Sequence, residues 1–203
     1  MANTVDPGTR RGAATRARIL AATAGLLSVS GSRNLTVSEI ARAAGVYPNQ
    51  ITHHFGSKDR LVLDAAFALF LRDTSRLQAA GRRAVGAEQF REVLARTALA
   101  MPSTVTVVQA LATTGSDAAQ RERVRLLLAV LFRQSERYLE RVIREQGWTS
   151  ASGVDRDART FWSTVFGATL LVSAGVSGSA SDLNLAATLS VTDPLQQSAI
   201  ASQ

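Results

Sequence analysis

Residues 45–58, GVYPNQITHHFGSK, gather the side chains of this chain that are best suited to chemistry or to contact with another molecule. The segment holds both histidines and the only lysine, with a tyrosine, a threonine and two amides. Amide and hydroxyl side chains read base edges in the major groove of DNA, and Asn49, Gln50 and Thr52 are of that kind. The side chains that can contact phosphate are those of Thr36, Tyr47, His53, His54 and Lys58.

Metal binding and catalysis are the alternatives for this segment. Adjacent positions on a helix point about 100° apart, so His53 and His54 cannot both reach one ion comfortably. The chain has no cysteine, and no paired carboxylates, Ser-His-Asp spacing or glycine-rich phosphate loop accompanies the histidines. We therefore expect no metal, no cofactor and no enzymatic activity.

Positive charge is concentrated in the first third of the chain. The first 60 residues carry eight basic and three acidic side chains, a net charge of +5, whereas the remaining 143 residues carry +2. This asymmetry favours a polyanionic partner, most simply nucleic acid. An anionic membrane surface and an ordinary basic surface fit the net charge alone equally well.

Two charge-free stretches, residues 97–116 and 160–181, are long enough to span a membrane. Both contain many Thr, Ser and Gly residues, whereas a spanning helix needs about 20 predominantly apolar ones. The N-terminal arginines are not followed by the apolar segment of a secretory signal. We therefore expect a cytoplasmic protein without membrane contact.

Helix signals place the segment in a helix-turn-helix. Thr36 and Glu39 have the spacing of a capping box, which predicts a helix that starts there and ends at Gly45. Pro48 suits the first turn of the next helix, in which Val46, Ile51 and Phe55 are spaced to face inward. A short turn containing glycine joins the two helices, and we assign Phe55 to the core.

The whole chain is predicted to be all-α. After a disordered tail (1–11), a first helix is expected over 12–31 and a long helix capped by Ser57 over 57–81. Further helices are expected over 87–101, 103–113, 117–146, 155–178 and 182–191. No alternating pattern predicts a strand.

Three motifs in register resemble the tetracycline-repressor-like (TetR/AcrR) regulators. They are "TRARILAATAGLL", "LTVSEIARAAGV" and "HHFGSKDRL", and the match covers about residues 14–63 without a gap. The resemblance implies a helix-turn-helix DNA-binding domain (12–56) and a larger helical ligand-binding and dimerisation domain (57–203). It further implies a homodimer that binds a pseudo-palindromic double-stranded DNA operator as a repressor and is released by a small molecule. A helical sensor or scaffold protein that has lost operator binding is the alternative.

The resemblance also assigns roles to individual positions. It implies backbone contacts by Thr36, Tyr47, His54 and Lys58, and phosphate approach by Arg16. The base-facing places belong to Pro48, Asn49, Gln50 and His53. The family usually has Gly where Asn49 stands and a DNA-contacting Tyr where Thr52 stands, so Tyr47 is expected to supply the aromatic phosphate contact.

The larger domain offers two hypotheses. Apolar surface interrupted by a few hydroxyl and amide groups favours an apolar or weakly polar effector, although an ordinary buried helix explains the same pattern. The expected pocket residues are Phe67, Phe70, Met101, Gln109, Phe132 and Trp162. Large aromatics interleaved with small residues over 160–180 predict the dimer interface: Phe161, Val165, Phe166 and Leu170.

Overall fold

The computed structural model describes residues 7–30, 35–112, 118–176 and 184–193. These residues form an all-α fold, as predicted, apart from two short strands. The elements are α1 (Pro7–Ser30), α2 (Val37–Ala44), α3 (Pro48–Phe55), α4 (Lys58–Gly81), α5 (Ala87–Ala100), α6 (Pro102–Ala112), α7 (Ala118–Gln146), β1 (Thr149–Ser150), α8 (Val154–Ser173), a 3-10 turn (Leu185–Thr188) and β2 (Val191–Thr192).

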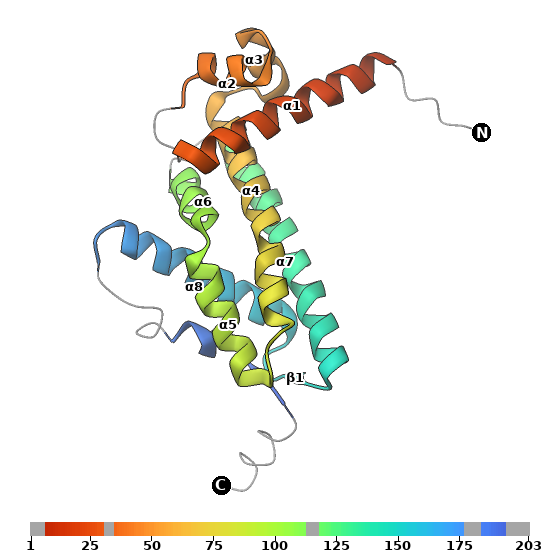
Figure 1. Cartoon of the computed structure of the whole chain (residues 1–203), viewed down its shortest axis with the longest axis vertical. Coiled ribbons are helices and arrows are strands. Elements are labelled where there is room, and N and C mark those ends of the chain that lie inside the picture. Colours follow the sequence, from red (N-terminus) through yellow and green to blue (C-terminus); the bar gives the residue numbers. More distant parts are fainter. Residues whose placement is uncertain (1–6, 31–34, 113–117, 177–183, 194–203) are drawn as a thin grey trace, which may run out of the picture.

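The helices form two units joined by α4 (Figure 1). Helices α1, α2 and α3 gather at one end of the molecule, where α1 packs against both α2 and α4. Helix α4 runs from this end into the second unit, where it packs against α5, α6 and α7. A movement of α4 relative to either unit therefore changes how the two units are oriented.

Local signals explain the boundaries of the first unit. The Thr36 hydroxyl accepts a hydrogen bond from the Glu39 N–H, and the Glu39 carboxylate accepts one from the Thr36 N–H, which confirms the predicted capping box. Gly45 ends α2 with φ of 61°, a left-handed conformation that favours glycine. Pro48 opens α3, and Ser57 caps α4 by accepting from the Arg60 N–H.

The second unit is organised around aromatic side chains. The Trp162 ring lies edge-on to Phe70 at 5.0 Å between ring centroids, and Phe166 packs against both. Phe67 and Leu131 are fully buried beside them in the same hydrophobic core. Edge-to-face pairs of this kind add specificity of orientation to the burial of apolar area.

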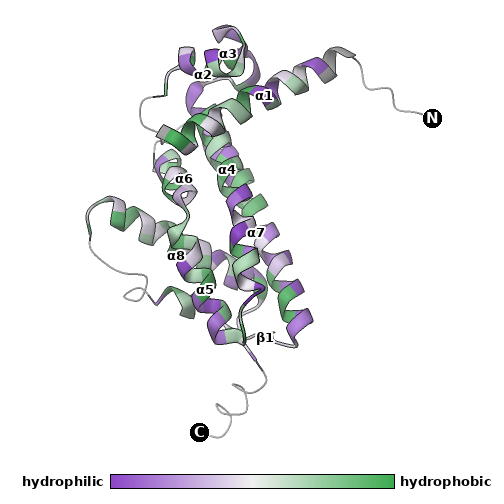
Figure 2. Cartoon of the chain, in the orientation of Figure 1, coloured by the Kyte–Doolittle hydropathy of each residue, from purple (hydrophilic) through white to green (hydrophobic). Residues whose placement is uncertain are grey.

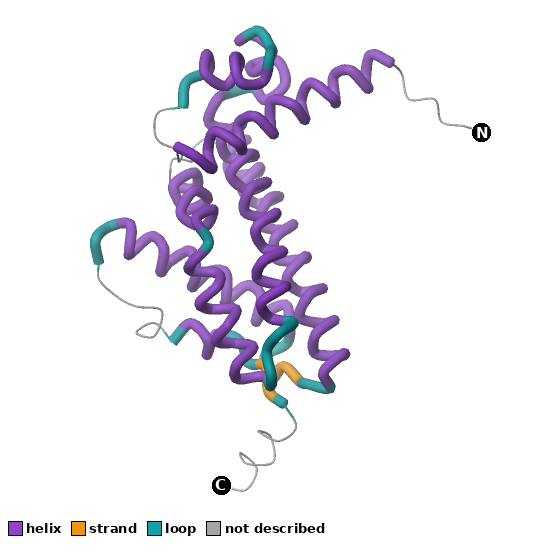
Figure 3. The backbone as a smooth tube through the Cα atoms, in the orientation of Figure 1, coloured by secondary structure: helices purple, strands orange, loops and turns teal. Residues whose placement is uncertain are grey.

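The structure corrects the predicted chain ends. Helix α1 begins at Pro7, so residues 7–11, expected in a disordered tail, are helical; proline suits a first helical turn. The helix expected over 182–191 is a single 3-10 turn followed by β2, which pairs antiparallel with β1 (Figure 3). The remaining residues of the predicted tail and of the segment 177–183 lie outside the described residues.

A buried carboxylate accounts for the extended chain before β2. Asp157, in the first turn of α8, accepts hydrogen bonds from the Ser190 N–H at 3.0 Å and from the Ser150 hydroxyl at 2.8 Å. These bonds tie β1 and the residue before β2 to α8. If a helix continued through Ser190, the Ser190 N–H would bond within that helix and could not donate to Asp157.

The helices differ in how apolar they are along their length. None of the helices within the described residues has the length and apolar character needed to cross a membrane. The free end of α8, however, is strongly apolar (Figure 2), with Leu170, Leu171 and Val172 exposed.

Candidate nucleic-acid interface

Helix α3 is attached to its unit by one apolar side and leaves a polar side at the surface. Ile51 and Phe55 are buried, which confirms the core assignment of Phe55. On the other side Asn49, Thr52 and His53 are exposed, and Gln50 is half-buried. Eight residues of helix, anchored at two points, thus present amide, hydroxyl and imidazole groups together.

Exposed side chains lie at the start of α3 and just beyond its end. The Tyr47 side chain precedes the helix and is 79% exposed, an unusual state for a large aromatic residue. Pro48, the first residue of α3, and Lys58, the first residue of α4, are exposed as well. Tyr47 therefore has the freedom to contact a phosphate that lies beside the N-terminus of α3.

The two histidines lie side by side near the end of α3. Their rings meet edge to face at 5.0 Å between centroids, with His53 exposed and His54 half-buried. Within the described part of the chain, no group of three or more His, Cys, Asp or Glu residues is arranged to hold a metal ion.

Thr36 is fully engaged in capping α2. Its N–H and its hydroxyl both donate to the Glu39 carboxylate, at 2.8 Å and 2.7 Å. The same bonds, first of all the one from the Thr36 N–H, hold the pKa of Glu39 below its ordinary value. A phosphate at Thr36 would have to displace a charged carboxylate, so its capping role is what the geometry supports.

Arg16 is also held by the protein. Its Nη2 lies 3.1 Å from Oδ2 of Asp64, and its guanidinium lies over the Phe55 ring at 4.6 Å from the centroid. Asp64, on α4, has a side chain that is 2% exposed, and its other oxygen accepts from Nε of Arg123 on α7 at 2.5 Å. One buried carboxylate therefore joins both units, and we call these three residues the Asp64 clamp.

Sequence reasoning missed the Asp64 clamp, although a signal was present. Asp64 interrupts the apolar run LVLDAAFALF. A charged residue inside such a run is either buried with a partner of opposite charge or interrupts the apolar side of the helix. The partner Arg123 lies 59 positions away, so only the fold identifies it.

The structure places the expected pocket residues in different surroundings. Phe67, Phe70, Met101 and Trp162 are buried side chains of the hydrophobic core. Phe132 lines a groove between α7 and α8. Gln109 lines a different cleft, which lies between α1, α4 and α6.

The residues expected at a dimer interface differ in their accessibility. Phe161 and Val165 are buried inside the protomer, so their side chains have almost no surface to offer a partner. Phe166 is half-buried against Phe70, whereas Leu170 is 51% exposed. Of the four residues, Leu170 in the later part of α8 therefore presents the most apolar surface.

Comparison with known proteins matches two family models. Residues 19–65 match the model described as bacterial regulatory proteins, tetR family, and residues 87–190 match one described as bacterial transcriptional repressor C-terminal. The two matches correspond to the two units of the fold, with the connecting α4 beginning inside the first. The comparison with curated proteins finds no match.

Solved structures show the same architecture. An inferred transcriptional regulator from Rhodococcus sp. RHA1 is 28% identical with a TM-score of 0.69, covering 85% of this chain and 91% of that one. FadR from Thermus thermophilus, a TetR family repressor in complex with lauroyl-CoA, is 22% identical with a TM-score of 0.57, covering 84% and 90%. The fatty acid degradation regulator FadR from Bacillus halodurans is 19% identical with a TM-score of 0.53, covering 86% and 90%. At their identities, the two FadR structures concern the fold alone.

Proposed function

Because the chain belongs to the tetR family of bacterial transcriptional regulators, we propose that it is a repressor that binds an operator as a homodimer and is released by a small molecule. The observation that carries this proposal is the polar, exposed side of α3, fixed to the first unit by buried Ile51 and Phe55. The same proposal implies the cytoplasm as its location, because the bacterial chromosome lies there.

In this proposal α3 lies in the major groove of DNA. The N-terminal part of the second helix of a helix-turn-helix contacts base edges, which favours Pro48, Asn49 and Gln50 as base-facing residues. Thr52 and His53, further along the same exposed side, extend that surface. Amide side chains are suited to adenine, so Asn49 and Gln50 are the strongest candidates for reading sequence.

Contacts to the DNA backbone come from the ends of α3. Tyr47 precedes α3 and Lys58 follows it, and both are exposed, whereas His54 is half-buried in the last turn of α3. These contacts fix the position of the helix without reading sequence. Because the Asp64 carboxylate and Phe55 already hold Arg16, we assign it a positioning role in place of a direct phosphate contact.

Dimerisation is proposed through the later part of α8. Leu170, Leu171, Val172 and Val176 leave large apolar side chains in water at this end of the helix. A second copy related by a two-fold axis covers such a patch with the same patch. Phe161 and Val165 then support this surface from inside the protomer.

An effector can release DNA only by favouring one arrangement of the two units over the other. A coupling of about 1–3 kcal/mol changes the affinity for the operator roughly 5- to 150-fold. The Asp64 clamp is suited to carry this coupling, because Arg16 belongs to α1 and Arg123 belongs to α7.

The test is a mobility-shift titration with DNA from upstream of the protein's own gene, at two salt concentrations. The parent should bind with a steep dependence on salt, because phosphate contacts release counterions. Replacing Asn49, Gln50 and His53 together with alanine should weaken binding at least about 100-fold, since each lost base contact is worth about 1–3 kcal/mol. Replacing Gln134 and Gln146, exposed on α7, with alanine is the matched control and should leave binding unchanged.

Two outcomes would contradict the proposal. If the α3 variant binds the DNA as tightly and selectively as the parent, α3 is not the reading helix. If the parent binds no DNA in any salt, the chain is instead a sensor or scaffold that has lost operator binding.

A further inference from the structure

A cleft of about 480 Å³ lies where the two units of the fold meet. Its size falls within the range of small-molecule sites, about 300–1,000 Å³. Its walls come from the last turns of α1, from α4 and from α6: Leu27, Ser28, Leu69, Arg72, Asp73, Arg76, Pro102, Ser103, Val105, Thr106 and Gln109. An occupant of this cleft would contact the DNA-binding unit and the second unit at once.

Asp73 gives the cleft a buried carboxylate that lacks a close partner. Its side chain is 10% exposed, and its ion pair with Nε of Arg72 is 3.9 Å long, beyond hydrogen-bond distance. Among the described residues this differs from the buried Asp64 and Asp157, whose oxygens each accept hydrogen bonds of 3.1 Å or less. The Asp73 oxygens are not fully buried and still reach the solvent of the cleft. Asp73 is therefore accessible to a donor from a ligand, and a hydrogen bond to a charged donor is stronger than one to a neutral group.

Ser103 adds a second polar group without a partner. The residue is 2% exposed, and within the described part of the chain its Oγ is the one buried side-chain polar atom that makes no hydrogen bond. Its neighbours behave differently: the Thr104 hydroxyl donates to the Ala98 carbonyl at 2.9 Å, and Thr106 donates to the Pro102 carbonyl. Buried hydroxyls are almost always bonded, so this one points to a missing partner.

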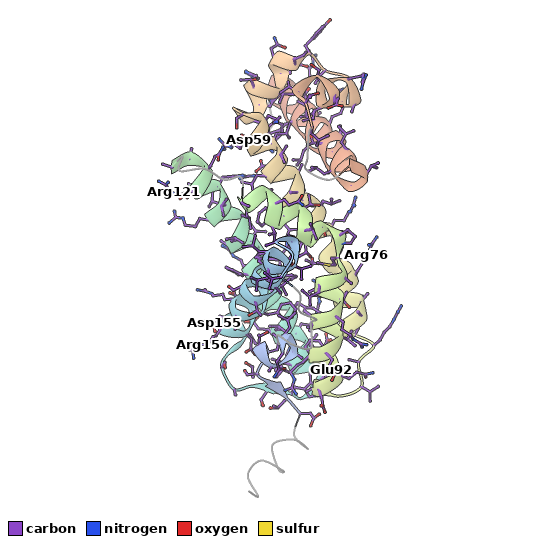
Figure 4. All side chains as sticks on the ribbon, turned by 90° about the vertical axis from the view of Figure 1, so that its left-hand side faces the viewer. Asp59, Arg76, Glu92, Arg121, Asp155 and Arg156 are labelled. Carbon is purple, nitrogen blue, oxygen red and sulfur yellow. The ribbon has the colours of Figure 1, made fainter. Side chains whose placement is uncertain are left out.

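The charge of that partner follows from which groups are desolvated. Arg72 and Arg76 are exposed at the edge of the cleft (Arg76 is labelled at the margin of the molecule in Figure 4), where water and salt screen their charges. The Asp73 side chain is 10% exposed, against 70% for Arg72, so the charge of Asp73 is screened less by water and interacts more strongly with a ligand in the cleft. The enclosed acid therefore decides the preference, which is for a cation.

We propose that the cleft between α1, α4 and α6 binds a small organic cation whose amidinium or ammonium group donates to Asp73. Its apolar body lies against Leu27, Leu69 and Val105. Ser103 lines the same cleft, so its unbonded hydroxyl is available to the ligand as well. That this cation is the effector rests on the function proposed above, whereas the binding itself does not.

The position of the cleft explains how such a ligand acts. Leu27 and Ser28 belong to α1, and the other walls belong to α4 and α6. A molecule held between them stabilises one separation of α1 from α6. Since α1 also packs against α2, the helix-turn-helix moves with it.

Binding is tested by calorimetry on the full chain with benzamidinium chloride, using benzoate and benzyl alcohol as the matched anion and neutral molecule. Benzamidinium should bind at least tenfold more tightly than either. Asp73→Asn should lower the affinity for benzamidinium at least tenfold, and Asp155→Asn should leave it unchanged. Asp155 is an exposed acid at the start of α8, on the opposite side of the molecule from Arg76 in Figure 4.

Ser103→Ala separates a ligand contact from a structural role. The affinity for benzamidinium should fall severalfold, while the urea midpoint of the free protein should not fall, because the hydroxyl has no partner to lose. A lower midpoint with unchanged affinity would assign Ser103 to the structure and overturn its role in binding. Failure of benzamidinium to bind, equal binding to the folded Asp73→Asn variant, or preference for benzoate would overturn the site itself.

Adding operator DNA distinguishes the site from its regulatory consequence. Saturating benzamidinium should weaken operator binding by the parent at least fivefold and leave the Asp73→Asn variant unaffected. Cation binding with no change in operator affinity would overturn the effector role and leave the site standing. Absence of any DNA binding would contradict the proposed function and not the calorimetric result.

Discussion

The Asp64 clamp makes a quantitative prediction about how the two units are held together. Loss of one member of a fully buried ion pair costs about 3–5 kcal/mol, because the other charge stays buried and unpaired. Here the carboxylate is 2% exposed, but the Arg16 and Arg123 side chains are 42% and 27% exposed and can recover part of their hydration. The cost of Asp64→Asn should therefore be smaller, about 1–3 kcal/mol of unfolding free energy.

The two halves of the clamp should differ in strength. Arg123 is the less exposed cation and its Nε lies 2.5 Å from Asp64, whereas Nη2 of Arg16 lies at 3.1 Å. Double-mutant cycles with Arg16→Gln and Arg123→Gln should give a coupling of about 1–2 kcal/mol for Asp64 with Arg123 and about 0.5–1 kcal/mol with Arg16. The contact of Arg16 with Phe55 is lost in both arms of its cycle and cancels.

The assay is urea denaturation of the full chain, followed by circular dichroism at one fixed protein concentration. The cycles are repeated at about 0.05 M and about 0.5 M salt, because the Debye length falls below about 10 Å between these concentrations. The higher salt should reduce the Arg16 coupling more than the Arg123 coupling. A stronger coupling to Arg16, or couplings to both arginines below about 0.3 kcal/mol, would refute the reasoning.

Three further predictions concern the second unit. Gly81→Ala should destabilise the fold by about 1–3 kcal/mol, because the new Cβ would meet the Tyr138 hydroxyl and lie 2.9 Å from the Phe90 ring. The control is Gly25→Ala, which has open space at its Cβ and should not destabilise the fold. Equal unfolding midpoints for the two variants would contradict this account. Asp157→Asn should lower the urea midpoint by the equivalent of about 1–3 kcal/mol, because an amide nitrogen cannot accept from Ser150 or Ser190; an unchanged midpoint would count against it. Burial raises the pKa of Tyr138 from 10.0 to about 12. The unfolded chain therefore loses the phenol proton at a lower pH than the folded protein, and the unfolding free energy should fall as pH rises from 10 to 12. If the unfolding free energies of the parent and Tyr138→Phe stay parallel over this range, the phenol contributes nothing.

The first unit was readable from sequence because its signals are local. Thr36 and Glu39 are three positions apart, and Gly45 and Ser57 act on the helices beside them, so each cap is set by its neighbours. The spacing of Ile51 and Phe55 likewise follows from the helical period. Their roles in folding needed no knowledge of distant residues.

The features that sequence did not predict depend on distant partners. Two-residue strands have no alternation to detect, and the pairing of Ser150 with Val191 joins segments 41 positions apart. Two of the aromatic residues expected around a pocket, Phe70 and Trp162, pack against each other and against Phe166 of α8, a contact that depends on how α4 and α8 meet. Asp73 and Ser103 likewise come together only because α4 packs against α6.

The clamp matters for orientation more than for stability. Buried ion pairs add little net stability compared with well-packed apolar residues, so Asp64 is not needed simply to hold α1, α4 and α7 together. Its two hydrogen bonds are directional, however, and each guanidinium must keep its angle to the carboxylate. If Arg16 acts through Asp64, Arg16→Gln and Asp64→Asn should weaken operator binding by similar factors. The salt dependence of binding should then be the same in both variants as in the parent. A direct phosphate contact by Arg16 would instead lower the salt slope by about one unit in Arg16→Gln alone. The slopes of the two variants, measured on the same DNA, therefore decide whether Arg16 belongs to the interface or to the joint behind it.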